Sequence, residues 1–254
     1  MAQGNIPIGL QLYSVREEAA KDLAAVLSAV QKMGYDGVEF AGFYNHDAAT
    51  VKKLLDDNGL KVCGAHVGID TLLGDELERS VEFHRTIGNE YLSVPGLGEK
   101  WRSSTDAWKE TARTMNGIAE RLAPHGMKTG YHNHAIEFKP LEEGGELPWD
   151  TFFGNTSPDV IMQFDTGNAL HGGAEALPFI QRYPNRALSV HLKEHSESNP
   201  KALIGEGDVP WPDIFSACET VGGTKWYVVE QESYAYPPLE CVDRCLQNLR
   251  AIGK

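Results

Sequence analysis

Residues 23–40, LAAVLSAVQKMGYDGVEF, are the stretch of sequence that decides the fold. The first part spaces its apolar residues three to four positions apart, which predicts a helix with one apolar stripe lying against a sheet. Gly34 then ends the helix, because glycine readily takes the left-handed conformation found there. Residues 37–40 follow with the length of a buried parallel strand. The stretch therefore predicts a helix that leads directly into a strand.

This alternation of a short strand and a longer helix occurs eight times along the chain. The predicted strands are residues 6–12, 37–40, 60–66, 91–94, 127–132, 160–165, 187–192 and 225–230. Acids at expected helix starts (Asp22, Asp47, Asp75, Asp106) and glycines at expected helix ends (Gly34, Gly59, Gly88, Gly126) separate them. Eight parallel strands with right-handed crossovers can close into a barrel without edges. We therefore expect the α/β class, with residues 1–254 forming a single (β/α)8 TIM barrel domain.

The rival architecture is an open, doubly wound sheet. Such a sheet usually carries a glycine-rich phosphate turn after an early strand, whereas residues 11–16 here read QLYSVR. The sequence has no dinucleotide-binding fingerprint and no linker that would divide it, although residues 142–146 are typical of a flexible loop. The barrel remains the preferred prediction.

Composition narrows the classes of partner. The formal charge of -13, from 36 acidic and 23 basic residues, would repel a phosphate backbone, so we expect no nucleic-acid partner. We expect no membrane partner, because no run of apolar residues is long enough to span a bilayer. Residues 1–7 lack the features of an export signal. A cytoplasmic location is expected, although a signal already removed would leave no trace.

The four cysteines form no CxxC pair, which fits a reducing compartment. Cys241 and Cys245 are four residues apart on an expected helix, and this spacing is compatible with a metal clip. Two small core residues are the commoner explanation of that spacing, and we adopt it.

Polar residues follow four adjacent strands at the end of the barrel where TIM-barrel active sites gather. His132, Asp165, His191 and Glu230 come at the ends of strands five, six, seven and eight. Because they should lie at a similar height, one cation can touch all four. Such a mixture of imidazole and carboxylate suits Mn, Mg, Co, Zn or Fe(II). The residues therefore predict one divalent metal ion, with Mn, Mg, Co or Zn as the cofactor.

A histidine at the end of a strand is, taken alone, more often a hydrogen-bonded packing residue than a ligand. The metal interpretation is favoured because four neighbouring strands share the pattern and because unpaired buried carboxylates are costly. On strand five, His132 and His134 face the same way. His132 is preferred as the ligand by its height, and His134 and Glu137 are then candidates for contact with substrate.

Motifs along nearly the whole chain resemble the sugar phosphate isomerase/epimerase family of xylose isomerase-like barrels. They are IGLQLYSVR (8–16), GYDGVE (34–39), YHNH (131–134) with EF (137–138), DTGN (165–168), HLK (191–193), GEGDVPW (205–211) and VEQE (229–232). The resemblance implies that Asp165, His191 and Glu230 are metal ligands and that Glu230 also serves as an acid or base. Ketose epimerases of this superfamily carry a glutamate on strand five, where this chain has His132. The YHNH run is more similar to the inosose dehydratase and keto-glycoside lyase or hydratase branches.

Both outcomes begin with the same chemistry. A metal polarises a carbonyl and a hydroxyl, while a base removes the proton α to the carbonyl and forms an enolate. Return of the proton elsewhere gives isomerisation or epimerisation, and loss of a β-substituent gives elimination. We therefore expect a divalent-metal-dependent sugar isomerase or epimerase, with a metal-dependent lyase, hydratase or dehydratase on a 3-keto-glycoside or inosose-type substrate as the alternative.

The assigned roles form three sets. Metal ligands are His132, Asp165, His191 and Glu230; catalytic groups are Glu230, His132 and Lys193; substrate-binding residues are Glu39, His66, His134, Glu137, Lys193, Glu206 and Trp211. Lys193 has the simpler alternative of pairing with Glu194 or Glu206. The expected partner is a small carbohydrate without phosphate, because the strand ends are mainly acidic. A homo-oligomer is possible by the same resemblance.

Two other kinds of protein remain in competition. An endonuclease of this barrel superfamily would need about three metals and a basic face for DNA, and the charge of -13 opposes it. A sugar-binding barrel that has lost its chemistry is compatible with the fold. The set of Asp165, His191 and Glu230 favours an enzyme instead.

Overall fold

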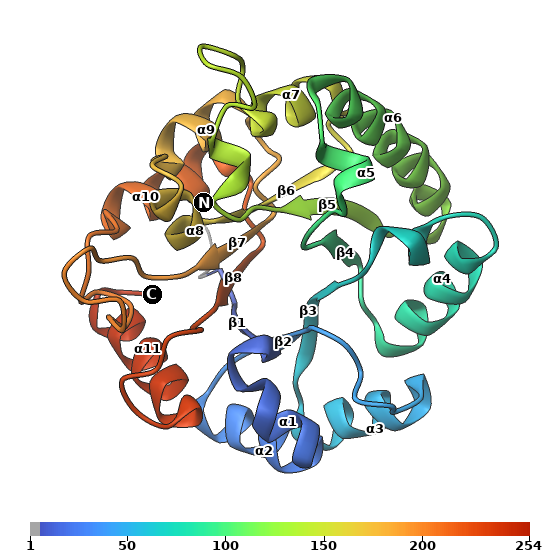
Figure 1. Cartoon of the computed structure of the whole chain (residues 1–254). Helices are drawn as coiled ribbons and strands as arrows, with labels where there is room; N and C mark the ends of the chain where they lie inside the picture. The colour runs from blue at the N-terminus through green and yellow to red at the C-terminus, as the bar shows by residue number, and fades with distance from the viewer. Residues whose placement is uncertain (1–5) are drawn as a thin grey trace.

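The computed structural model describes residues 6–254, and its eight parallel strands close into a barrel in sequence order, with helices around the outside (Figure 1). The strands are β1 Ile8–Gln11, β2 Gly37–Phe40, β3 Lys61–His66, β4 Tyr91–Val94, β5 Lys128–His132, β6 Ile161–Asp165, β7 Ser189–Leu192 and β8 Trp226–Val229. Their ends lie within two residues of the predicted ones. The predicted (β/α)8 barrel is confirmed. The expectation about an export signal concerns residues 1–7, of which residues 1–5 lie outside the described residues.

The α-helices are α1 Arg16–Lys21, α2 Leu23–Met33, α3 Ala48–Asn58, α4 Glu76–Ile87, α5 Glu99–Arg102, α6 Thr105–Leu122, α7 Pro148–Asn155, α8 Thr166–His171, α9 Ala176–Arg182, α10 Trp211–Ala217 and α11 Pro238–Ala251. Short 3-10 turns (η1 Leu12–Val15, η2 Ile69–Leu72, η3 Ala123–His125, η4 Ile136–Phe138) and a π turn (η5 Cys218–Gly222) join them. Asp22 and Asp47 accept backbone N–H bonds at the starts of α2 and α3, as expected of N-caps. At α6 the cap is Ser104, and Asp106 lies in the first turn.

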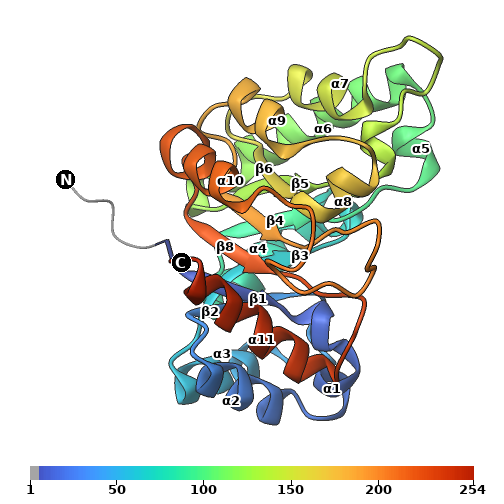
Figure 2. The ribbon, with the colours of Figure 1, turned by 90° about the vertical axis from the view of Figure 1, so that its left-hand side faces the viewer.

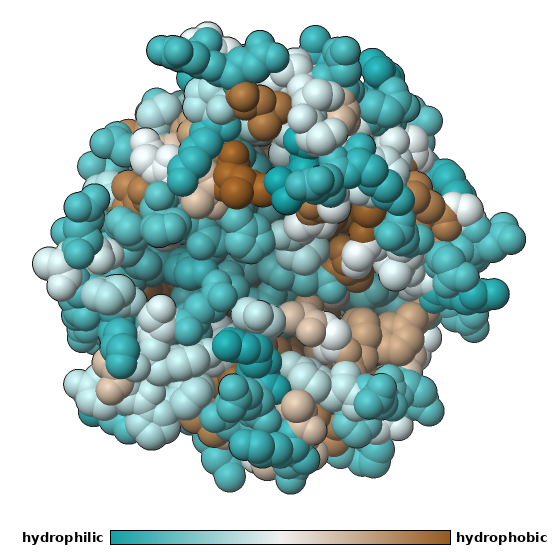
Figure 3. All heavy atoms as spheres, in the orientation of Figure 1, coloured by the Kyte–Doolittle hydropathy of each residue, from teal (hydrophilic) through white to brown (hydrophobic). Residues whose placement is uncertain are grey.

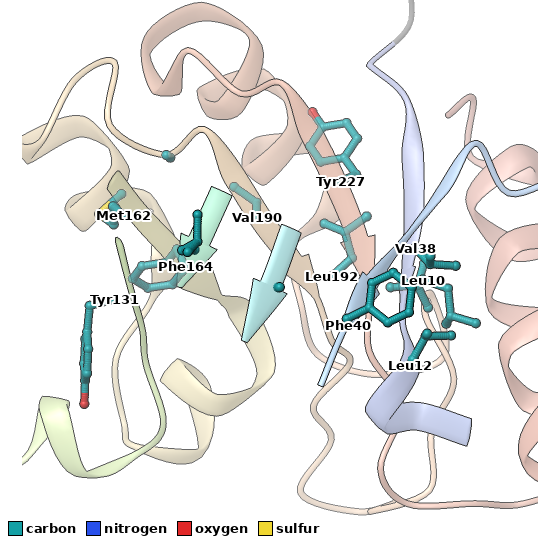
Figure 4. Close-up of a cluster of buried hydrophobic side chains, with 14 of the residues drawn as sticks. Leu10, Leu12, Val38, Phe40, Tyr131, Met162, Phe164, Val190, Leu192 and Tyr227 are labelled. Atoms are coloured by element: carbon teal, nitrogen blue, oxygen red, sulfur yellow. The ribbon is translucent and has the colours of Figure 1, made fainter. Parts of the chain in front are cut away.

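The main core lies between the strands and the helices that cover them. Successive strand residues point to opposite faces, so Met162 and Phe164 of β6 point outward into this core (Figure 4). Gln163 and Asp165 of the same strand point into the barrel, where Gln163 contacts Glu39 of β2. Figure 2 shows the barrel from the side, with α8 and α5 at the end where the strands finish.

The inside of the barrel changes from apolar to polar along its axis. Near the starts of the strands, Cys63, Trp226 and Val228 form a small apolar cluster separate from the main core. Gly9 makes room for it, since a Cβ there would lie 2.4 Å from the Cys63 sulfur. Nearer the mouth, at the ends of the strands, the inward side chains are polar. The fold therefore directs a polar cluster toward the mouth.

The remaining expectations about the chain can be compared directly with the structure. Within residues 6–254, none of the helices combines the length and apolar character needed to span a membrane. All four cysteines are buried and unpaired, and Cys241 and Cys245 belong to the core as expected. Residues 141–146 are exposed and contain no helix or strand.

Candidate active site

The four predicted ligands meet at the mouth of the barrel. One donor atom from each of His132, Asp165, His191 and Glu230 lies within 4.8 Å of the others, and all four residues are buried. His132 ends β5, Asp165 ends β6, His191 lies in β7, and Glu230 follows β8 directly. Side chains on four neighbouring strands can therefore surround a single point.

The strand register shows how these side chains come together. Asp165 and His191 are direct partners across β6 and β7, as a common height requires. His132 is paired instead with Gln163, two residues before Asp165, and the partner of His191 on β8 is Val228, two residues before Glu230. The ligands thus follow the stagger that closure of a barrel imposes on its strands. Their donor atoms still converge, because the side chains lean toward one another.

Two atoms of the group have no hydrogen-bond partner. Oδ2 of Asp165 and Nδ1 of His132 are buried and unpaired, although buried polar atoms are usually satisfied. Oδ1 of Asp165 is held by the backbone N–H of Asn168 at 2.6 Å, so the carboxylate is fixed with its other oxygen free. A cation at this point would satisfy both unpaired atoms. The donor set therefore fits a divalent metal.

The electrostatics of the group follow from the same crowding of charge. Burial raises the pKa of Asp165 to about 7, against the opposing effect of Lys193. Burial also acts against protonation of His191, but Glu39 and Glu230 outweigh it and raise the pKa of this histidine to about 10. For Glu230, the attraction of Lys193 and His191 outweighs burial and lowers the pKa of the carboxyl. The raised pKa values of Asp165 and His191 show that these two residues tend to hold protons, which offset the negative charge of the buried carboxylates. A bound cation could offset the same charge.

A second group of possible ligands, His66, His132 and His191, overlaps the first. In this group Nε2 of His66 and Nε2 of His191 already contact Glu39, at 2.8 and 3.0 Å. Because both nitrogens already have Glu39 as a partner, neither is an unpaired atom like Oδ2 of Asp165 or Nδ1 of His132. The group of His132, Asp165, His191 and Glu230 is therefore the better candidate for the metal.

A cavity of about 370 Å³ opens beside the ligand group. Its lining includes His132 and Glu230 together with His66, His134 and Tyr13. Figure 3 shows the mouth of the barrel as a hollow in which hydrophilic side chains gather. Two residues predicted to bind substrate, His66 and His134, thus lie beside the candidate ligands, and the cavity has room for a six-membered ring with its hydroxyls.

Lys193 lies at the border of this cavity. Its ammonium contacts Glu232, which lines the cavity, while Lys193 itself lines an adjoining cavity of about 490 Å³. Burial acts against its charge, but Asp165, Glu230 and Glu232 outweigh that effect and raise the pKa of the lysine. Lys193 therefore pairs with Glu232 and not with the Glu194 or Glu206 considered from the sequence.

Two other predicted substrate-binding residues are held by protein groups. Glu137 is fully buried, and its oxygens accept hydrogen bonds from the Tyr131 hydroxyl at 2.6 Å and the His134 backbone N–H at 2.7 Å. Glu39 is also fully buried, beneath the ligand group. Its pKa is lowered, because the attraction of His66 and His191 outweighs the effect of burial.

Glu206 lies on the loop between β7 and α10, Trp211 is the first residue of α10, and neither lines a cavity at the mouth. Glu194 organises this loop, accepting hydrogen bonds from the backbone N–H groups of Gly205 and Val209 and from the Trp211 indole. The exposed Glu206 accepts one from Leu203. A role in substrate binding for these two residues stays a prediction.

Sequence reasoning missed two groups of the site. Glu232 was not assigned a role, although it lies two residues after Glu230. Gln163 was overlooked two residues before Asp165, yet it contacts both His66 and Glu39 at 2.7 Å. The period of two that places strand residues on one face would have identified Gln163.

Comparison with known proteins finds relatives over most of the chain. The inosose dehydratase of Erwinia tasmaniensis is 28% identical over 246 residues, covering 82% of this chain and 81% of that protein. The inosose dehydratase of Geobacillus kaustophilus is 24% identical over 278 residues, covering 90% and 89%. A crystal structure of a sugar phosphate isomerase/epimerase from Parabacteroides distasonis superposes with a TM-score of 0.84 at 24% identity, covering 98% of this chain and 97% of that one. At that identity, the structural likeness shows the fold.

The family assignment rests on a family model. A family model described as the xylose isomerase-like TIM barrel matches residues 27–252. The resemblance inferred from the motifs is confirmed, as is the expectation of an enzyme from this superfamily. This chain belongs to the xylose isomerase-like TIM barrel family.

Proposed function

We propose that this protein is a divalent-metal-dependent dehydratase that eliminates water from an inosose-type keto-polyol. The observation that carries the proposal is the buried group of His132, Asp165, His191 and Glu230, with two unpaired atoms, beside a ring-sized cavity. The names of the two relatives support elimination over epimerisation. This reverses the order of the two functions expected from the sequence.

His132, Asp165, His191 and Glu230 would hold the metal. When bound, a divalent ion acts as a Lewis acid that stabilises negative charge on a substrate oxygen. The charge of the site fits a divalent ion. The carboxylates of Asp165, Glu230 and Glu232 lie close together, and Lys193 is the cationic side chain beside them. Mn, Co, Zn and Mg remain the candidates.

The reaction needs one base and one acid. Glu230 is the candidate base for the proton α to the ketone, because it reaches both the ligand group and the cavity. Its lowered pKa keeps the carboxylate in the ionised form that a base requires, while the same charges of Lys193 and His191 reduce its proton affinity. Lys193, with its raised pKa, remains an ammonium and can supply a proton through its partner Glu232 to the departing β-hydroxyl. The hydroxyl leaves as water with the proton from Lys193, and the carbon–carbon double bond forms between its carbon and the α-carbon. Glu230 then releases the α-proton to solvent and Lys193 takes one up, so that one water is lost overall.

The lining of the cavity favours a neutral substrate. The cavity is bordered by three histidines and by the acids Glu230 and Glu232, and its lining among the described residues includes no arginine or lysine. A phosphate would lack the cationic clamp that it normally requires. Histidine and carboxylate side chains suit hydroxyl groups, which both donate and accept hydrogen bonds.

The test is incubation of the metal-loaded protein with an inosose in deuterated water. Loss of one water, detected by mass spectrometry with the rise of the conjugated product's ultraviolet absorption, is the expected result. Deuterium incorporation at the α-carbon with an epimeric product and no loss of water would show an isomerase or epimerase instead. No exchange with inososes or keto-sugars would refute both functions.

The adjoining cavity favours a second candidate, elimination from a 3-keto-glycoside. Lys193 lines that cavity and touches Glu232 of the first, so a substrate of two rings could extend across the pair. The leaving oxygen would then belong to the second ring. Faster release of an alkoxide from a 3-keto-glycoside than of water from an inosose, in the same assay, would favour this candidate.

A further inference from the structure

The fully buried carboxylate of Glu39 has a position that substrate binding does not explain. Each of its contacts comes from a different strand of the barrel. Nε2 of Gln11 and Nε2 of Gln163 donate at 2.7 Å, and Nε2 of His66 and Nε2 of His191 lie at 2.8 and 3.0 Å. Within residues 6–254, its ion pairs involve only these two histidines.

The strand beside it is shaped to admit this carboxylate. Gly64 of β3 faces Glu39, and a Cβ at Gly64 would lie 2.7 Å from Oε2 of Glu39. That distance is too short for any real Cβ contact, so any larger residue would displace the carboxylate. The barrel therefore holds Glu39 in a fixed slot directly below the ligand group.

The two nitrogens of His191 face different groups. Nε2 faces Glu39 at 3.0 Å, while Nδ1 lies 2.6 Å from Glu230 and 4.0 Å from Asp165. Nδ1 is therefore the nitrogen directed at the candidate metal. A neutral imidazole that offers Nδ1 to a cation must carry its proton on Nε2, and Glu39 is placed to accept that proton's hydrogen bond.

We propose that Glu39 is a positioning residue whose carboxylate fixes the orientation and the tautomer of His191 and so sets the metal affinity of the site. The same carboxylate and Gln163 hold Nε2 of His66, which leaves Nδ1 of His66 as the acceptor. Glu39 thus orders two histidines at once and touches no substrate. This inference rests on the metal site of the proposed function and replaces the substrate-binding role expected from the sequence.

Glu39→Gln is the decisive variant because it keeps the shape but removes the negative charge and replaces one of the two acceptor oxygens with an NH2 donor. All four partners of Glu39 present N–H groups, and an amide nitrogen would face a donor. We expect the Kd for Mn²⁺, measured by electron paramagnetic resonance, to rise by about 10–100-fold, the usual cost of losing a group that orients a ligand. Glu137→Gln is the matched control, since Glu137 is equally buried but contacts no ligand side chain; its Kd for Mn²⁺ should equal that of the unsubstituted protein.

A second measurement, nuclear magnetic resonance of the histidine side chains, uses the unsubstituted protein and does not depend on whether a variant folds. In the zinc-loaded, ¹⁵N-labelled protein, the imidazole resonances of His191 should show a protonated Nε2 and a coordinated Nδ1. Coordination through Nε2, or a Glu39→Gln protein that binds Mn²⁺ within about twofold of the unsubstituted one, would overturn the inference. Failure of the unsubstituted protein to bind Mn²⁺ would overturn the proposed function with it, so the two failures are distinguishable.

Discussion

Buried polar groups lie at both ends of this barrel, but at the mouth some of them have no hydrogen-bond partner. At the end where the strands start, Arg186 is nearly buried, and its guanidinium donates to the carbonyls of Val160 and Phe153 and to the hydroxyl of Thr156. At the mouth, Asp165 and His132 each keep an unpaired buried atom.

The difference teaches which end serves stability and which serves chemistry. A satisfied buried group adds to the free energy of unfolding, whereas an unpaired one subtracts from it and persists when function requires it. TIM barrels generally separate these tasks, with catalysis at the ends of the strands and stability at the starts. Substitutions at the mouth should therefore change activity, and those at the opposite end should change stability.

The largest expected effect comes from Asp165→Asn. The amide keeps an oxygen for the Asn168 N–H but removes the charge, so we expect metal binding to fail and activity to fall by at least about 100-fold. Because a buried, unpaired carboxylate is costly, the metal-free variant should melt no lower than the metal-free parent. Thermal melts with a chelator present test this. A large drop in melting temperature would mean that Asp165 is a stabilising residue like Arg186.

Arg186→Met tests the opposite end. The change leaves buried carbonyls without donors and removes the packing of the guanidinium on the Phe153 ring, 4.9 Å away. We expect the free energy of unfolding to fall by about 3 kcal/mol, from several lost hydrogen bonds. Urea denaturation measures this, and metal content should be unchanged. If Arg186→Met lost the metal but kept its stability, the proposed division between a stabilising end and a chemical end of the barrel would be wrong.

His84, also at the strand-start end, predicts a pH dependence. It is buried beside Asn89, and burial lowers its pKa to about 4. Because the unfolded chain then binds the proton more readily, the stabilisation is complete above about pH 6.5 and falls as the pH drops toward 4. Between pH 7 and pH 5 the loss should be about 2 kcal/mol.

The measurement is urea denaturation across this pH range, with His84→Gln as the control. The variant should lose the His84 part of the pH dependence, and parallel profiles for the two proteins would contradict the assignment.

The smallest effect is expected for Glu194→Gln, at the mouth. Glu194 holds the β7–α10 loop by hydrogen bonds to Gly205, Val209 and Trp211. An amide can accept only part of this set, so the loop should loosen while global stability changes by about 1 kcal/mol. Hydrogen exchange of residues 205–211 should become faster. Unchanged protection there would show that other contacts fix the loop.

Local sequence signals were sufficient for the fold. The apolar stripe of α2, the glycine that ends it and the short strand after it recur around the barrel, and each depends on neighbours a few residues away. Asp165 and His191 could be found in the same way, because both lie at the ends of short apolar strands. Those predictions needed no knowledge of long-range contacts.

The parts that sequence reasoning did not find depend on long-range contacts. The guanidinium of Arg186 donates hydrogen bonds to the carbonyls of residues 153 and 160, and no local sequence pattern predicts that arrangement. Glu39 seemed free to bind a sugar because its four donors come from strands far along the chain. The pairing of Lys193 with Glu232 likewise depends on how β7 and β8 lie side by side.

The measurement that tests the central claim most directly is the metal content of the purified protein by elemental analysis. The account predicts about one divalent ion per chain, bound by the single group of four ligands, with none in Asp165→Ala, His191→Ala or Glu230→Ala. Arg186→Met should retain the ion. No ion in the unsubstituted protein, even after incubation with manganese, zinc or cobalt, would contradict the account.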